Sequence, residues 1–92
     1  MESIRYTLER KKGRVFALYY QALNGTPSLS GKYTFEMRIE PSGEISSLRL
    51  ISSELSDPGL DNAILDRIRD IQFKEEDVIT ALVTYTYVFI EN

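Results

Sequence analysis

The chain has 92 residues and contains neither cysteine nor histidine, which excludes disulfide bonds, thiolate chemistry and the commonest general base and metal ligand. Its 42% hydrophobic content predicts one modest core in a single domain. No apolar run approaches about 18 residues and no signal-peptide pattern follows Met1, so the sequence predicts no membrane span. The abrupt helix-like start leads us to expect a piece of a longer chain.

Charge is unevenly distributed along the chain. Residues 1–14 hold five basic and two acidic residues, whereas residues 15–92 hold six basic and twelve acidic ones. A nucleic-acid-binding domain carries its basic patch on the folded body, and here that body is acidic. We interpret the KKGR run at 11–14 as a solvated helix face or a linker end, with an anion-binding patch as the alternative. We therefore expect a basic helical lead-in at 1–13 and the folded domain at 14–92.

The first predicted element is a helix over residues 3–23. Apolar residues recur there at helical spacing, interrupted by a polar run through Gly13. The Asn-Gly pair at 24–25 ends the helix, because both residues readily adopt the left-handed cap conformation. Since few apolar residues precede Gly13, we expect residues 1–12 to be loosely held.

A β-hairpin is predicted next, over GKYTFEMRIEPSGEI at 31–45. Apolar and polar residues alternate from Tyr33 to Glu40, so one face of the strand should lie on a core. The Pro-Ser-Gly turn at 41–43 separates strands at about 31–40 and 44–51. The apolar phase shifts after Ile45, which indicates a β-bulge near Ser46 and Ser47.

A second helix begins at the Ser-Asp-Pro sequence of 56–58, which offers a capping side chain followed by a proline suited to the first turn. One apolar stripe follows at helical spacing, formed by Leu60, Ala63, Ile64, Ile68 and Ile71.

A polar loop at 74–77 precedes a long strand predicted at 78–90, which is rich in β-branched and aromatic residues and has no breaker. One face of this strand carries Ala81, Val83, Tyr85, Tyr87 and Phe89, and the other carries Leu82, Thr84, Thr86, Val88 and Ile90.

The element order is therefore helix, strand, strand, helix, strand. The connection through the second helix is long enough for a crossover, and a right-handed crossover places both helices on one face of the sheet. We predict an α+β fold with a three-stranded antiparallel or mixed sheet in the order 2-1-3. The last strand would then lie at an edge.

An ordered set of residues runs through about 14–90: Tyr20, Ala22, Leu23, Pro27, Leu29, Gly31, Ile39, Gly43, Ile45, Ser52, Ser53, Asp57, Pro58, Leu60, Arg67, Phe73 and the YTYVF run at 85–89. This set resembles the carboxy-terminal domain of TonB-related energy transducers, and most of all the AgmX/PglI carboxy-terminal family of bacterial envelope and gliding-motility proteins. Family members often carry cysteines where this chain has Tyr19 and Ala63, so the implied helix–helix disulfide is absent and ring packing could fill the gap. The family's proline in the last strand is Thr86 here.

The resemblance implies a non-enzymatic protein-interaction module. It would form the periplasmic end of an envelope protein that couples an inner-membrane complex to an envelope or outer-membrane partner, in transport or gliding motility. The implied location is the periplasm, with an inner-membrane anchor in a segment outside this chain. The alternative is a structural domain that self-assembles into a homodimer through its exposed last strand.

Catalytic, cofactor and metal sites are not predicted. Glu54, Asp57 and Asp61 surround a serine-rich loop and could suggest a calcium site, but acids at a helix start are explained by capping and the helix dipole. The loop serines have no histidine to activate them.

Aromatic residues offer a further alternative, a stacking platform for single-stranded nucleic acid formed by Tyr33, Tyr85 and Tyr87. All three fall on the apolar phases of their strands, so core packing is the favoured interpretation and no nucleic-acid partner is expected.

The predicted site is the edge of the last strand, formed by Val83, Thr84, Tyr85, Thr86, Tyr87 and Val88. Edge strands are usually defended by charge, brevity or proline, and residues 78–90 contain neither charge nor proline. Thr86 restores a backbone N–H donor at the family's proline position. We expect backbone pairing with an extended partner segment, with Thr84, Thr86 and Val88 setting selectivity.

Overall fold

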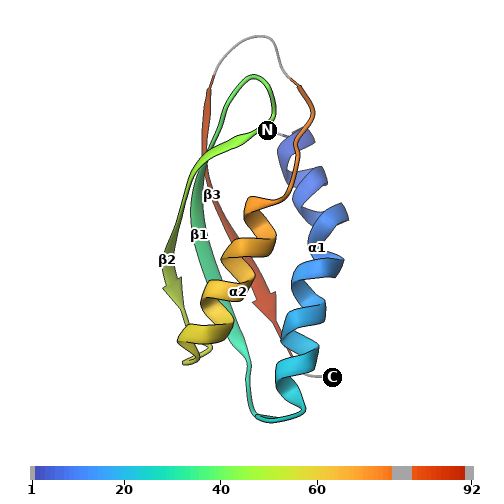
Figure 1. Ribbon diagram of the computed structural model, residues 1–92, viewed down its shortest axis with the longest axis vertical. Coiled ribbons are helices and arrows are strands. Elements are labelled where there is room, and N and C mark those ends of the chain that lie inside the picture. Colours follow the sequence, from blue (N-terminus) through green and yellow to red (C-terminus); the bar gives the residue numbers. More distant parts are fainter. Residues whose placement is uncertain (1, 76–79, 91–92) are drawn as a thin grey trace.

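The computed structural model describes residues 2–75 and 80–90. Its elements are α1 (Glu2–Leu23), β1 (Gly31–Ile39), β2 (Ile45–Ser53), α2 (Pro58–Arg69) and β3 (Ala81–Phe89). Both helices cover the same face of a three-stranded sheet (Figure 1). The predicted α+β fold is therefore confirmed. The predicted loop residues 76–77 and the predicted strand start at 78–79 lie outside the described residues.

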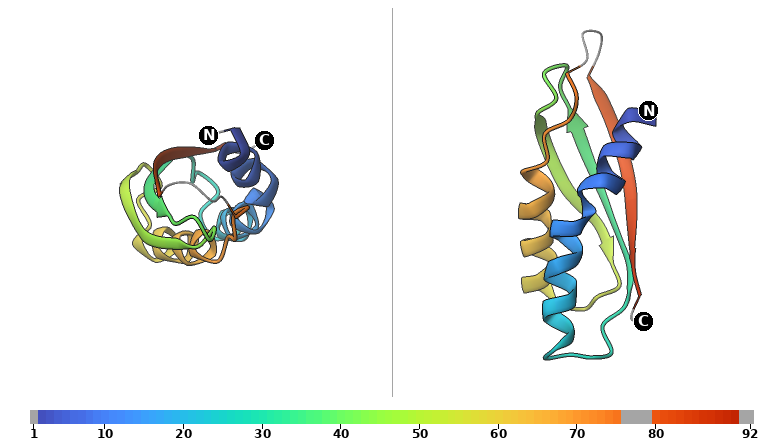
Figure 2. Two further views of the ribbon diagram at one scale, coloured as in Figure 1. Left: turned by 90° about the horizontal axis from the view of Figure 1, so that it is seen from above. Right: turned by 90° about the vertical axis from the view of Figure 1, so that its right-hand side faces the viewer.

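Strand β1 occupies the centre of the sheet. The order is β2-β1-β3, as predicted, and both neighbours of β1 run antiparallel to it. The long axes of the helices and strands run roughly together, which gives the molecule its elongated shape (Figure 2). Within the described part of the chain, strand β3 is therefore paired on one side only, and we call its other side the free side.

The ladder between β1 and β2 contains two bulges. Arg38 pairs with Ser47 and Ile39 with Ile45, so Ser46 is the extra residue and the predicted bulge is confirmed. A second irregularity inserts Ile51, after which the two strands remain paired. For this reason β2 extends to residue 53, two residues beyond the predicted end.

Helix α2 begins as its sequence indicates. The carboxylate of Asp57 accepts a hydrogen bond from the backbone N–H of Leu60 at 3.1 Å, and Pro58 occupies the first turn. Leu60, Ile64 and Ile68 turn into the core. Ala63, also placed on the stripe, is only partly buried.

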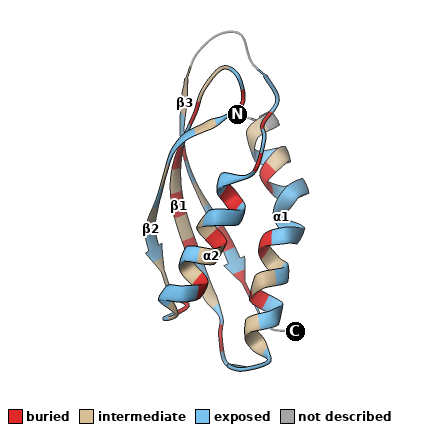
Figure 3. Cartoon of the chain, in the orientation of Figure 1, coloured by how far each residue is buried: buried red, intermediate tan, exposed pale blue. Residues whose placement is uncertain are grey.

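The core lies between the helical layer and the sheet, as the buried bands on the facing sides of both helices show (Figure 3). Alternate side chains of β1 are buried there, which confirms the predicted apolar face. The core residues are Leu8, Val15, Tyr19, Leu29, Tyr33, Phe35, Met37, Ile39, Leu55, Leu60, Ile64, Ile68, Ile71, Phe73, Val83, Tyr87 and Phe89.

Helix α1 passes through Gly13 without a break. The side chain of Leu8 is fully buried, and its carbonyl accepts a hydrogen bond from the Tyr87 hydroxyl at 2.8 Å. The expectation that the segment before Gly13 has little to dock is therefore wrong at Leu8. The boundary between a lead-in at 1–13 and a domain at 14–92 stays a prediction.

Candidate functional site at the free edge of β3

Strand β3 separates its residues between the core and solvent in the predicted phases. Of the six residues predicted as the site, Val83 and Tyr87 are buried and Tyr85 is partly buried. Thr84, Thr86 and Val88 are exposed on the face of the sheet that the helices leave open. The six residues therefore form one strand, but only three offer their side chains to a partner on that face.

Backbone direction along β1 determines which groups of β3 are free. In an antiparallel strand, the N–H and C=O of one residue point to the same side, and successive residues alternate. The carbonyl of Lys32 accepts from the N–H of Glu54 at 2.9 Å, and the N–H of Glu40 donates to the carbonyl of Glu44 at 2.9 Å. The backbone N–H and C=O groups of even-numbered β1 residues therefore point toward β2, and those of odd-numbered β1 residues point toward β3.

The odd-numbered β1 residues pair with odd-numbered β3 residues, from Gly31 with Phe89 to Ile39 with Ala81. The N–H and C=O groups of the intervening β3 residues therefore point away from β1, along the free side. The close approach of the Thr34 and Thr86 hydroxyls, 2.9 Å apart, agrees with this, because side chains lie closer in pairs that are not hydrogen-bonded. We call Leu82, Thr84, Thr86 and Val88 the outward row.

The two edges of the sheet differ in how well they are protected. The β2 edge is interrupted by two bulges and carries Arg49, both of which discourage strand addition. The β3 ladder runs through nine consecutive pairs without a shift, and the strand holds neither charge nor proline. The β3 edge is therefore the better template for an incoming strand.

Contacts with α1 hold β3 in place on the helix-covered face of the sheet. The Tyr87 hydroxyl donates to the Leu8 carbonyl, and the Tyr85 hydroxyl donates to the carboxylate of Glu9. The ring of Phe16 meets the Tyr87 ring edge-on with centroids 5.7 Å apart, and lies 4.6 Å from that of Phe89. A strand fixed in this way loses little further conformational entropy when a partner binds.

These tyrosines are held in their neutral form. Burial raises the pKa values of Tyr33 and Tyr87, and burial followed by the hydrogen bond to Glu9 raises that of Tyr85. The Tyr85 hydroxyl, together with Lys12, lowers the pKa of Glu9. The contact between Glu9 and Tyr85 thus joins a carboxylate to a neutral phenol, which is a charge-assisted hydrogen bond.

The acidic residues near the serine-rich loop have structural roles. The Glu54 carboxylate accepts from the N–H of Lys32 at 2.7 Å, Asp57 caps α2, and Asp61 accepts from the Ser53 hydroxyl at 2.7 Å. Within residues 2–75 and 80–90, no group of three or more acidic residues could hold a metal ion.

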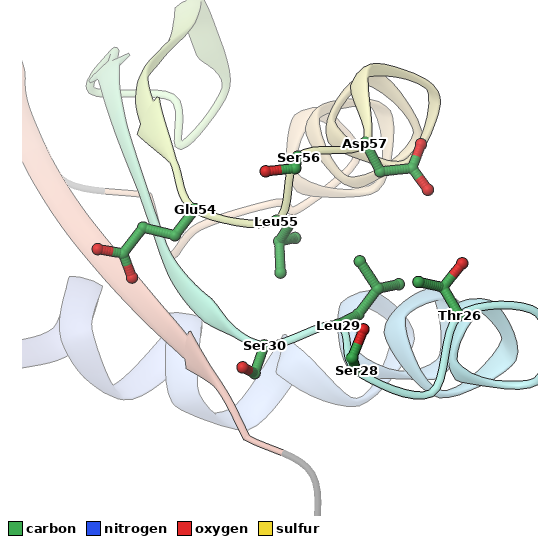
Figure 4. Close-up of a pocket in the computed structure, with 8 residues that line it drawn as sticks. All are labelled: Thr26, Ser28, Leu29, Ser30, Glu54, Leu55, Ser56 and Asp57. Carbon is green, nitrogen blue, oxygen red and sulfur yellow. The ribbon is translucent and has the colours of Figure 1, made fainter.

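A cavity of about 280 Å³ lies beside this loop, lined by Thr26, Ser28, Leu29, Ser30, Glu54, Leu55, Ser56 and Asp57. In Figure 4, Leu29 and Leu55 point toward each other across it, while the carboxylates of Glu54 and Asp57 point away on opposite sides. A binding site needs polar groups that converge, so this arrangement does not form one.

The stacking alternative meets a similar obstacle. Tyr33 and Tyr87 are buried, with 0% and 2% of their surface exposed, so their rings are covered by the core. Tyr85 alone of the three has partial exposure. Among the described residues, neither helix is long and apolar enough to cross a membrane.

Comparison with known proteins places the fold. No family model and no curated protein matches the chain. The solution structure of the TonB C-terminal domain of Helicobacter pylori (residues 194–285) is similar, with a TM-score of 0.59 and 14% sequence identity over 74% of each chain. At this identity the likeness shows the fold alone. The TonB-like fold is therefore confirmed, and the AgmX/PglI assignment stays a prediction.

Proposed function

We propose that this domain is a non-enzymatic protein-interaction module that binds an extended partner segment as a fourth strand beside β3. The observation that carries the proposal is the outward row, whose N–H and C=O groups form an uninterrupted template on a strand with no charge, bulge or proline. Peptides that add to a sheet edge gain affinity from backbone pairing and selectivity from alternate side chains.

The surroundings of the edge favour an uncharged segment with small or β-branched residues. On the open face, a bound strand would lie beside Thr84, Thr86 and Val88, all of them neutral. On the helix side it would approach Tyr85, whose hydroxyl is already engaged by Glu9. Selectivity would therefore depend mainly on the shape of the partner's side chains on the open face.

The cellular setting of the proposal comes from the family resemblance and from the shared fold. We place the domain in the periplasm, where it would couple an inner-membrane complex to an envelope or outer-membrane partner, in energy transduction for transport or in gliding motility. A membrane anchor would belong to a segment outside these residues.

A second candidate function is self-assembly through the same edge. Because β3 holds no charged residue, two copies could pair antiparallel along their outward rows without like-charge repulsion. Concentration-dependent molar mass in analytical ultracentrifugation would support this alternative. A monomer at all concentrations would exclude it and leave peptide binding as the remaining candidate function.

The decisive variant is Thr86→Pro, which deletes an outward N–H while leaving the β1 ladder intact. Proline is tolerated on an edge strand when its missing N–H faces solvent. Thr86→Val is the matched control, because it keeps the N–H and the β-branched shape while it loses the hydroxyl that meets Thr34.

The partner can be found by placing a photocrosslinking residue at Val88 in the protein within its own cells. With that partner or with a second copy, Thr86→Pro should weaken binding at least about tenfold, as expected for an uncompensated backbone group plus a steric clash. Thr86→Val should bind within about threefold of the parent protein. A folded Thr86→Pro protein with unchanged affinity would show that this edge is not the site, and an unfolded one would show that the outward row is wrongly assigned.

A further inference from the structure

Away from the β3 edge, a second concave surface lies between the N-terminal half of α1 and the connection from α2 to β3. This cavity measures about 490 Å³ and is lined by Tyr6, Thr7, Arg10, Lys11, Gln72, Phe73 and Lys74. We call it the basic pocket. Among the described residues that line it, three are cations and none is an acid. Such a concentration of one charge is unusual in a chain whose net charge is −3.

Helix periodicity accounts for half of this surface. Tyr6, Thr7, Arg10 and Lys11 occupy positions i, i+1, i+4 and i+5 of α1, which lie together on one helix face. The neighbouring Lys12 points elsewhere, because its ammonium pairs with Glu9 at 2.9 Å and lies over the Phe16 ring. The basic run thus divides, and only Arg10 and Lys11 line the cavity.

The opposite wall is held in place by the hairpin turn. The side-chain amide of Gln72 donates to the Ser42 carbonyl at 3.0 Å, and the N–H of Phe73 donates to the Gly43 carbonyl at 2.9 Å. The contact at Gly43 is close, since a Cβ there would come within 2.1 Å of the Phe73 carbonyl oxygen. The backbone just before Lys74 is therefore anchored, and Lys74 extends from a fixed wall.

Within the described residues, no acidic side chain forms an ion pair with the three cations of the pocket. The ion pairs of the described residues use Lys12, Arg38, Arg49 and Arg69. Arg10, Lys11 and Lys74 form no ion pair within the described part of the chain, and the flanking Asp70 and Glu75 do not line the cavity. Like charges held together repel each other, and a bound anion would relieve that repulsion.

We propose that the basic pocket binds a phosphate-bearing anion. Arginine presents a planar fork that matches phosphate oxygens, while lysines add point charges. The exposed Tyr6 adds a phenol hydroxyl and Phe73 adds an apolar ring, which gives a lining suited to a phosphate attached to a larger group. The phosphate could belong to a lipid headgroup or to a soluble molecule, and both sources share this chemistry.

The test uses two probes with the whole chain. Inorganic pyrophosphate, followed by amide chemical shifts, reports soluble anions. Cosedimentation with vesicles of equimolar phosphatidylcholine and phosphatidylglycerol, against phosphatidylcholine alone, reports headgroups. Binding to pyrophosphate alone assigns a soluble source, and binding to vesicles alone assigns a headgroup. Either result supports the proposal, and binding to neither overturns it.

Charge-reversed variants separate the pocket from general surface attraction. Lys11→Glu and Lys74→Glu, made separately, should each weaken binding at least about tenfold, as expected for loss of a charge-assisted contact and gain of repulsion. Lys32→Glu is the matched control, because it makes the same charge change at an exposed residue on the central strand. A Lys32→Glu protein weakened as much as the pocket variants would overturn the proposal.

This test is independent of the β3 edge. The pocket variants should bind the edge partner as the parent protein does, and Thr86→Pro should leave pyrophosphate binding unchanged. Shifts should concentrate at the amides of residues 6–11 and 72–74. A shift pattern spread evenly over α1 and the open sheet face would contradict a defined site.

Discussion

Replacing Ile64 with alanine tests the architecture most directly. Ile64 lies in the middle of α2, is fully buried, and belongs to the stripe that faces the core beneath the sheet. The substitution removes three carbon atoms without adding a polar group. Since alanine is the best helix former, any loss of stability reflects packing and not helix propensity.

The magnitude follows from burial. At about 0.8 kcal/mol for each buried methylene, the lost transfer free energy is about 2.4 kcal/mol. A cavity term adds to this, because neighbours on α1 and the sheet cannot fully collapse into the space, and measured aliphatic truncations span about 2–5 kcal/mol. We expect about 3–4 kcal/mol, a large part of the roughly 5–14 kcal/mol typical of a domain of this size.

Urea unfolding followed by circular dichroism measures the loss of unfolding free energy. The comparison requires that the slope of the unfolding free energy against urea concentration is the same in all variants. Ile90→Ala is the matched control: it is the same truncation at a residue that is 61% exposed, and it should change stability by less than about 0.5 kcal/mol. A loss below about 0.5 kcal/mol for Ile64→Ala would refute its place in the core and the packing of α2 described above.

Two further predictions concern the tyrosines of β1 and β3 whose side chains face the helices. Tyr87→Phe removes the hydrogen bond to the Leu8 carbonyl and should lower the free energy of unfolding by about 1 kcal/mol. In this variant, amide hydrogens of residues 5–12 should exchange faster than those of residues 15–23. Equal exchange in the two halves of α1 would contradict the contact between Tyr87 and the N-terminal half. Folding raises the pKa values of Tyr33, Tyr85 and Tyr87, so their contribution is complete below the unfolded value of about 10 and is lost as pH rises toward the folded values. Stability should therefore fall at alkaline pH in step with tyrosinate absorbance, less steeply in Tyr87→Phe, and a flat profile would argue against burial of these rings.

Local signals explain why so much of the fold was predictable. The two-residue alternation from Tyr33 onward gives β1 a single buried face, and the phase change after Ile45 marks the bulge at Ser46. Asp57 and Pro58 specify the start of α2 through a side-chain cap and a fixed backbone angle. Each of these signals depends on residues a few positions apart, so it can be read without the rest of the chain.

The N-terminal half of α1 was harder to interpret because its anchors are distant in sequence. A glycine within a helix costs about 1 kcal/mol relative to alanine, which made Gly13 look like an interruption. The burial of Leu8 and the hydroxyl of Tyr87, 79 positions away, offset that cost. The spacing of Leu8, Val15 and Tyr19 along one helix face was the signal that could have revealed this docking.

The basic pocket was hidden for the same reason. The run at 11–14 indicates a cluster of charge, but a helix directs consecutive residues to different sides. Lys12 thus forms an ion pair with Glu9, while Lys74 lies near Arg10 and Lys11 only because of the tertiary fold. Sequence alone could therefore suggest an anion-binding patch without identifying its residues.

The candidate edge shows the limit of sequence-based inference most clearly. The pattern from 78 to 90 identified the strand, and the strand order predicted from the crossover gave its edge position, but neither showed which residues direct their backbone groups outward. That parity is set by the bonds from Lys32 to Glu54 and from Glu40 to Glu44, which commit the even-numbered residues of β1 to β2. A slip of one residue would place Tyr85 in the outward row instead of Thr86. Tyr85→Pro should therefore break the hydrogen-bonded ladder to β1 and destabilise the fold, whereas Thr86→Pro should leave the fold stable. The reverse result would show that the odd-numbered residues of β3, and not the even-numbered ones, direct their backbone groups outward.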